Sequence, residues 1–270
     1  MTTVVVAFLA VSAAASPVLA LVQGATGLDP TILVLAQFST AVGALVAYAV
    51  WRGRLPYPRT TRRGVVAPLC AAAGLALMVT LVLWLLAIAE PHRWQSPHTS
   101  MLPAPLALIL FAQFLGAAGE EVGWRGFVQP ILETRMATLS AAAITGLLFG
   151  LGHFPVAGAG LAVYSVFVVS AIGLSVAAAA VTTGRPWWAR VLVSTVLHWG
   201  VNIGILVGFS NADESMLWMA NTAIAMGLVG AACVPFLLRP NRRGSSGSPA
   251  PARDPGFHAP GPGPRADQRL

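Results

Sequence analysis

Eight long apolar segments, separated by short polar connections, limit the possible folds of this chain more than any other feature. Runs of about 18 or more apolar residues are long enough to cross the hydrocarbon core of a bilayer. The segments lack the alternating pattern of barrel strands, so helices are the spanning form that remains. The sequence therefore predicts an all-α, polytopic membrane helix bundle with about eight transmembrane helices. The segments cover approximately residues 3–22, 31–51, 64–89, 105–134, 138–154, 162–182, 191–209 and 216–238.

The composition supports a membrane protein. Hydrophobic residues make up 56% of the 270 residues and charged residues only 9%, whereas soluble domains carry about 25% charged residues. All 16 basic residues are arginine. Basic connections on the cytoplasmic side of a membrane explain this excess, so we expect the lipid bilayer, and not nucleic acid, as a partner. Cys70 and Cys233 lie inside apolar segments and indicate no disulfide framework.

The arginines also predict how the chain crosses the membrane. They gather at 51–63, at Arg135, at 185–190 and at 239–243, and Arg93 is the one arginine in the connections of the opposite side. Eight alternating crossings place these four clusters on one side, which the positive-inside rule makes cytoplasmic, with both termini inside. Abundant alanine and arginine without lysine is typical of a high-GC bacterial genome. The expected location is therefore a bacterial cytoplasmic (plasma) membrane.

The two ends of the chain need separate predictions. The first segment, MTTVVVAFLAVSAAASPVLA, ends in small residues as a cleaved signal peptide does. It lacks the basic residues that precede the apolar core of such a peptide, so we expect a retained span. After Leu238 the composition changes to Pro, Gly, Ser and Arg. We expect a transmembrane bundle over residues 1–238 and a disordered, Pro/Gly/Arg-rich cytoplasmic tail over residues 239–270.

Two adjacent carboxylates lie inside the fourth apolar segment, in the stretch GEEVGWRGF. Ionisable groups at this depth cost roughly 2.5–3.5 kcal/mol each on insertion scales and indicate function. Glu121 and Arg125 are four residues apart on a helix, so they can form an ion pair. Glu120 is rotated by about 100° from Glu121, so it can point into a cavity. One arginine neutralises at most one of the two carboxylates. A break in the helix is expected near Pro130.

Two further polar clusters lie in other segments. Phe149 and His153 are one turn apart at the end of the fifth segment, where Phe149 would pack beside His153, and His198 and Asn202 are one turn apart in the seventh. Counted from the inner connections, Glu120 and His153 both lie roughly 22 Å deep, and His198 and Asn202 about 12 and 18 Å deep. The clusters can therefore meet in the inner half of the membrane and form one site.

The residue types suggest hydrolysis of an amide or an ester. A carboxylate beside a histidine in a pocket of low dielectric can hold and deprotonate a water molecule. A His/Asn pair offers N–H donors that can stabilise an oxyanion. Simpler roles exist for each residue alone: Asn202 as a hydrogen-bonding link between helices, His153 as an interfacial residue, and Arg125 as a side chain that reaches the inner surface.

The three clusters together resemble the signature of the CPBP family, the intramembrane CAAX prenyl endopeptidase and bacteriocin-processing group, also called the Abi family. Its pattern is E-E-x-x-x-R, F-x-x-x-H and H-x-x-x-N or -D. The chain has EEVGWR at 120–125, FGLGH at 149–153 and HWGVN at 198–202, within a CPBP-like core of about 105–205. The resemblance implies an all-helical bundle with a cavity inside the membrane, and an endopeptidase of the CAAX-processing type.

The resemblance also implies roles for single residues. Glu120 and His153 would activate the water, and His198 and Asn202 would stabilise the oxyanion. The substrate would be a membrane protein or peptide. Processing of a true CAAX sequence needs a prenylated cysteine, which is a eukaryotic modification, so bacterial relatives would cleave other membrane-associated peptides. The sequence gives no indication of the oligomeric state.

Glu121 and Arg125 would then be a supporting pair, and the need for a metal is a separate question. Members of the family are often labelled metalloproteases. If zinc were bound, Glu120, His153 and His198 would be its ligands. The chain contains no H-E-x-x-H helix, and we favour a mechanism without a cofactor.

Two other classes of function remain open at this point. In a transporter or channel, the carboxylates would form a proton or cation site. In a non-catalytic protein of the bacteriocin-immunity type, the motif residues would only hold the helices together. The intact set of motifs favours the endopeptidase.

Overall fold

The computed structural model describes residues 2–62, 64–88, 102–208 and 215–239. By its contacts the chain divides into residues 1–238 and residues 239–270. Only Arg239 of the second unit is described, so the predicted disordered tail lies outside the described residues. The fold presented below is that of the first unit.

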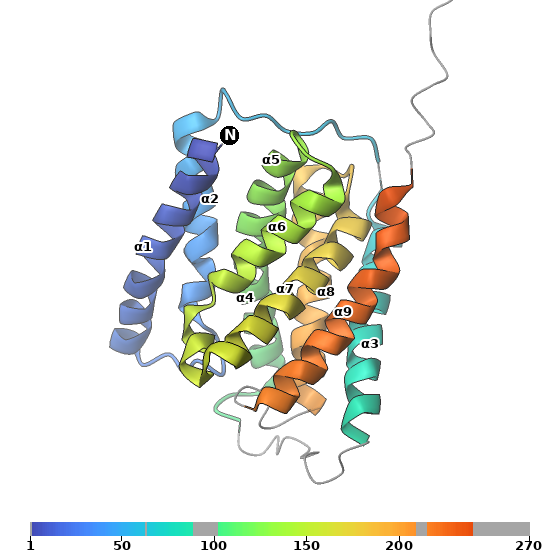
Figure 1. Cartoon of the computed structure of the whole chain (residues 1–270). Coiled ribbons are helices and arrows are strands. Elements are labelled where there is room, and N and C mark those ends of the chain that lie inside the picture. The colour runs from blue at the N-terminus through green and yellow to red at the C-terminus, as the bar shows by residue number, and fades with distance from the viewer. Residues whose placement is uncertain (1, 63, 89–101, 209–214, 240–270) are drawn as a thin grey trace, which may run out of the picture. The chain divides into compact units, whose positions relative to one another are not determined.

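The described residues form helices and contain no strand, which confirms the predicted all-α membrane bundle. Three of the elements are not α-helical: η1 and η5 are 3-10 helices, and η4 is a π-helix. The elements, shown in Figure 1, are α1 (Thr2–Thr26), η1 (Leu35–Phe38), α2 (Ser39–Trp51), α3 (Val66–Ile88), α4 (Leu106–Gly123), η4 (Trp124–Val128), α5 (Gln129–Glu133), α6 (Thr138–Leu151), η5 (Phe154–Ala159), α7 (Leu161–Thr182), α8 (Trp187–Gly208) and α9 (Met216–Leu238).

Each of the eight predicted apolar segments is helical over most of its length, but the segments differ in their ability to span a membrane. Among the described residues, six helices are long and apolar enough to cross: α1, α3, the continuous run Leu106–Glu133, α7, α8 and α9. The helices over Leu35–Trp51 and Thr138–Leu151 are shorter. A proline limits each of these two, because Pro30 precedes the first and Pro155 follows the second.

The arginine-bearing connections lie at one end of the bundle. In Figure 1 the α2–α3, α5–α6 and α7–α8 connections and the last turn of α9 share the upper end. Backbone bonds tie two of them together, since the amides of Thr61 and Arg62 donate to Gly184 O at 2.9 and 3.0 Å. The Arg185 side chain donates to Gly64 O at 2.5 Å. The predicted clustering of arginine on one side is thus present, and its assignment to the cytoplasm stays a prediction.

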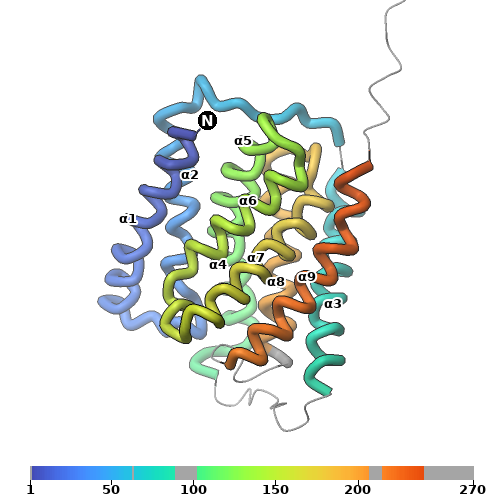
Figure 2. The backbone as a smooth tube through the Cα atoms, in the orientation of Figure 1, coloured from blue at the N-terminus to red at the C-terminus, as the bar shows by residue number. Residues whose placement is uncertain are grey.

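Small residues allow the central helices to approach closely. Helix α7 lies beside α6 and α9 (Figure 2). A Cβ added at Gly173 of α7 would lie 2.5 Å from Met226 O of α9, and one added at Gly146 of α6 would lie 2.6 Å from the Cα of Ile172. Backbones this close make extensive van der Waals contacts, and such contacts drive helix association in lipid. The arrangement brings the end of α6 beside the centre of the bundle.

The expected break near Pro130 is replaced by a widened turn. The helix continues from α4 through η4 into α5, with Pro130 in the first turn of α5. The Gln129 amide donates to Trp124 O, five residues back, in place of the usual four. Proline has no N–H and collides with the preceding turn, and the π-turn accommodates it without ending the helix. The turn starts directly after the paired carboxylates.

Candidate active site

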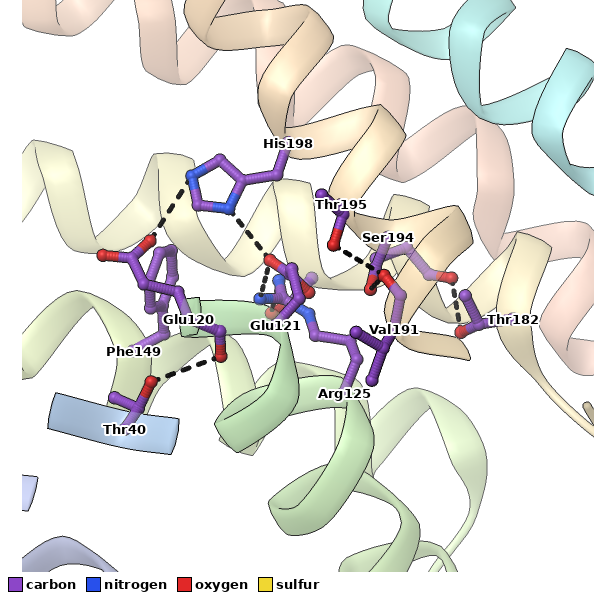
Figure 3. Close-up of polar contacts among 12 residues, drawn as sticks. Thr40, Glu120, Glu121, Arg125, Phe149, Thr182, Val191, Ser194, Thr195 and His198 are labelled. Atoms are coloured by element: carbon purple, nitrogen blue, oxygen red, sulfur yellow. Dashed lines mark hydrogen bonds and ion pairs between the residues drawn. The ribbon is translucent and has the colours of Figure 1, made fainter. Parts of the chain in front are cut away.

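Three helices bring one carboxylate and two imidazoles together. Glu120 of α4 is 6% exposed. Its Oε1 lies 3.8 Å from His153 Nε2, just beyond the end of α6, and its Oε2 lies 3.6 Å from His198 Nε2 of α8. Figure 3 shows Glu120 reaching toward His198. The His198 side chain is buried, whereas that of His153 is 32% exposed. The site is therefore most open beside His153.

The second carboxylate makes two short contacts. Glu121 Oε1 accepts from Arg125 Nη1 at 2.9 Å, so the expected i, i+4 ion pair is present. The same oxygen lies 2.9 Å from His198 Nδ1 (Figure 3), a contact that the sequence did not predict. If Glu121 accepts the hydrogen of Nδ1, the neutral ring presents a lone pair at Nε2 toward Glu120, and Nε2 carries a hydrogen only in the imidazolium form.

Arg125 is fully buried and contacts two residues besides Glu121. Its Nη2 donates to Ser175 Oγ of α7 at 2.8 Å. Its Cζ lies 5.3 Å from the centre of the Phe149 ring, within the range of a cation–π contact. Ser175 was not among the predicted residues. A lone serine in the apolar run of α7 was a weak signal, because its partner lies on another helix.

Phe149 packs at the centre of the site, beside His153 as expected. Its ring centre lies 4.7 Å from that of His153, 5.8 Å from that of His198 and 5.7 Å from that of Trp124. The Phe149 carbonyl oxygen lies 2.9 Å from His153 Nδ1. A carbonyl can only accept, so Nδ1 carries a hydrogen, and Nε2 of the neutral ring is left free to face Glu120.

Asn202 is the predicted residue that the structure does not join to the others. It lies one turn beyond His198 on α8 and is partly exposed. Within the described part of the chain, no hydrogen bond links its side chain to the cluster. Its predicted role at an oxyanion stays a prediction.

Helix α4 is also held by η1 and α2, through residues that the sequence analysis missed. Thr40 Oγ1 donates to Gly119 O at 3.2 Å and to Glu120 O at 3.4 Å (Figure 3). A Cβ at Gly119 would lie 2.8 Å from the Phe38 ring, and one at Gly123 would lie 2.5 Å from Thr40 Cβ. The glycine spacing in LGAAGEEVG could have indicated this close approach. It fixes the backbone that carries Glu120.

The mechanism without a metal, favoured from the sequence, stays a prediction. Glu120 approaches both imidazoles, yet within the described ranges no group of three or more His, Cys, Asp or Glu side chains could hold a metal ion. The zinc ligands considered from the sequence, Glu120, His153 and His198, are not such a group, and no step below passes through a metal.

Comparisons with known proteins agree with the motifs. Residues 102–204, which include every predicted site residue, match a family model described as type II CAAX prenyl endopeptidase Rce1-like. The chain is also 23% identical over 235 residues to lysostaphin resistance protein A from two strains of Staphylococcus epidermidis. This alignment covers 84% of the chain but only 60% of the length of those relatives. The family resemblance seen in the motifs is confirmed.

Proposed function

Because residues 102–204 carry the match to the Rce1-like CAAX prenyl endopeptidases, we propose that this multi-pass membrane protein is an intramembrane endopeptidase. It hydrolyses a peptide bond of a membrane-associated protein or peptide. The observation that carries this proposal is the position of the Glu120 carboxylate, with one oxygen 3.8 Å from His153 and the other 3.6 Å from His198. Polar groups at such separations are commonly bridged by water.

In the proposed reaction, Glu120 and His153 hold one water molecule between Glu120 Oε1 and His153 Nε2. Glu120 removes a proton as the water oxygen attacks the peptide carbonyl, and that proton later passes to the leaving amine. The burial of Glu120 keeps bulk water from competing for the carboxylate. His153 is the more exposed partner, so the peptide approaches from its side.

Stabilisation of the oxyanion is assigned to His198 and Asn202. His198 donates from Nε2 only as an imidazolium, because Glu121 occupies Nδ1 at 2.9 Å. The carboxylates of Glu120 and Glu121 flank this ring, at 3.6 Å from Nε2 and 2.9 Å from Nδ1. Asn202 donates from its amide after a side-chain rotation. A donor placed at the oxyanion is worth about 10²–10³ in rate.

Arg125 and Ser175 support this arrangement without touching the substrate. Arg125 holds Glu121 at 2.9 Å, and Ser175 holds the other guanidinium nitrogen at 2.8 Å. These contacts fix the carboxylate that orients His198. A buried carboxylate without such a partner would be costly, so the support also stabilises the fold.

A comparison of membrane peptides tests the proposal and identifies the substrate. Cells that contain the wild-type protein are compared by mass spectrometry with cells that contain Glu120→Ala at equal membrane levels. We expect fragments that occur only with the wild type. Their cleavage site defines a quenched-fluorescent reporter peptide for purified protein. Identical fragments in both cells would overturn the proposal and favour a non-catalytic role, whereas ion flux abolished by Glu120→Gln without proteolysis would favour a transporter.

A further inference from the structure

Gln37 differs from the other glutamines of the bundle. Each of the others makes at least one hydrogen bond. Gln23 bonds to three backbone groups, Gln113 donates to two backbone carbonyls, and Gln129 donates to Glu133, although Gln129 Oε1 has no partner among the described residues. Gln37 Oε1 is buried without a partner, and no hydrogen bond joins either end of this amide to another described residue. A polar group in a membrane bundle is normally hydrogen-bonded. The amide is therefore a candidate for binding something outside the chain.

The Gln37 amide lies against the turn of α4 that precedes Glu120. It packs on Gly116 of α4, where an added Cβ would overlap Gln37 Oε1. Gly116 is one helical turn before Glu120. Helical side chains lean toward the helix N-terminus, so the Glu120 carboxylate extends over the turn that contains Gly116. Gln37 is also partly exposed. The side chain is thus accessible in part, whereas its Oε1 packs against α4.

The backbone that carries Gln37 is held in place by the end of α1. Gln23 Nε2 donates to Leu33 O at 3.1 Å, and Gln23 Oε1 accepts from the Leu35 amide at 2.8 Å. The backbone N–H of Gln37 donates to Val34 O at 3.1 Å, and this bond forms the first turn of η1. The side chain therefore projects from a fixed segment, as a preorganised binding group requires.

We propose that Gln37 binds the backbone of the substrate next to the scissile bond. When the amide turns about its terminal torsion so that Oε1 leaves Gly116, it donates to a peptide carbonyl and accepts from a peptide N–H, which are the two groups that an extended peptide offers on one edge. The inference rests on the proposed endopeptidase function. It adds a contact from outside residues 102–204, and it defines the substrate class as an extended segment recognised through its backbone, whatever its side chains.

The reporter peptide described above provides the test. Gln37→Met keeps the length of the side chain and removes its hydrogen bonds, so we expect KM to rise about tenfold with kcat unchanged. Gly116→Ala displaces the amide without altering it and should raise KM similarly. Gly74→Ala is the matched control, because an added Cβ there meets no atom within 4 Å. An unchanged KM in both Gln37→Met and Gly116→Ala would overturn the inference.

A set of ester-substituted reporters separates binding from a structural effect. Each reporter replaces one peptide N–H near the cleavage site by oxygen. Where the ester replaces the N–H that Gln37 binds, we expect kcat/KM to fall about fivefold for the wild type and to stay unchanged for Gln37→Met. Equal losses for both proteins at every position would contradict the inference. If Glu120→Gln also cleaved the reporter, the proposed function itself would fail, and the two failures are therefore distinguishable.

Discussion

Two buried glutamates of the run Leu106–Glu133 each pair with an arginine, and the two pairs differ in what surrounds them. Glu121 and Arg125 pair at 2.9 Å beside the site. Glu133 at the end of α5 and Arg190 of α8 pair at 2.6 Å near the arginine-rich end. Each pair has side chains no more than 5% exposed. Burial and ion pairing are thus common to both regions and do not by themselves indicate catalysis.

The difference lies in the balance of charges. Both oxygens of Glu133 have partners, because Oε2 accepts from Arg190 and Oε1 accepts from Gln129 at 2.9 Å. Glu121 uses only Oε1, and its Oε2 has no hydrogen-bond partner among the described residues. Next to it lies Glu120, whose nearest basic groups are imidazoles at 3.6 and 3.8 Å. The first region has a carboxylate in excess of its arginine, which a charged His198 can balance, whereas the second region has one carboxylate for one arginine. A buried carboxylate without an arginine is costly and is retained where chemistry needs it.

The largest effect is expected from removing the excess carboxylate. Glu120→Gln should lower cleavage of the reporter peptide by about 10²–10⁴, because the general base is lost. The same change removes a buried carboxylate that has no arginine partner among the described residues, so Tm in nanodiscs should change little. A lower Tm together with full activity would show that Glu120 is structural, as Glu133 is.

The second pair should respond in the opposite way. Glu133→Ala leaves Arg190 buried without its carboxylate, so we expect a loss of about 3–5 kcal/mol in unfolding free energy. Cleavage per folded molecule should stay near the wild-type level. Replacing both partners by leucine should recover most of the stability. If Glu133→Ala abolished cleavage in fully folded protein, the separation between the two regions would be wrong.

A change at Asn202 tests the predicted oxyanion donor without disturbing the Glu121–Arg125 ion pair. Asn202→Ala should lower kcat by about 10²–10³ if the amide stabilises the oxyanion. Because no hydrogen bond holds this side chain among the described residues, Tm should change little. Asn221→Ala on α9 is the matched control, since it removes another partly exposed amide. Equal activity of the two variants would exclude Asn202 from the mechanism.

The smallest effect is expected from the serine behind Arg125. Ser175→Ala removes a hydrogen bond to a charged group, which should cost roughly 1.5–3 kcal/mol of unfolding free energy and reduce kcat/KM about fivefold through a less ordered Glu121. Ser170→Ala on the same helix is the control, because Ser170 bonds only to Phe167 O of its own helix at 2.6 Å. Indistinguishable kinetics of the two variants would remove Ser175 from the supporting network.

Local periodicity made part of this site predictable. The apolar segments indicated the helices, and the spacing of Glu121 and Arg125 indicated their ion pair. Counting residues from the inner connections placed Glu120 and His153 at one depth, and the structure brings them within 3.8 Å. These inferences need only the geometry of a single helix, or the fact that neighbouring helices end at the same side of the membrane.

Contacts between helices were beyond such reasoning. The sequence analysis treated Arg190 as part of a basic connection, whereas its side chain is 2% exposed and bonded to Glu133. The His198–Glu121 contact depends on how α8 is rotated about its own axis, which periodicity does not determine. The sequence analysis correctly expected an irregularity near Pro130, but it predicted a break where the structure has a π-turn. Both forms follow from the N–H that proline lacks, so the sequence alone did not distinguish them.

The water between Glu120 and His153 offers the most direct test of the central claim. An experimental structure in a lipid nanodisc, at a resolution that shows ordered solvent, would locate it. The account predicts one water molecule within hydrogen-bond distance of Glu120 Oε1 and His153 Nε2, with His198 facing Oε2. A Glu120 carboxylate turned away from both imidazoles, or bonded directly to them with no solvent between, would contradict it.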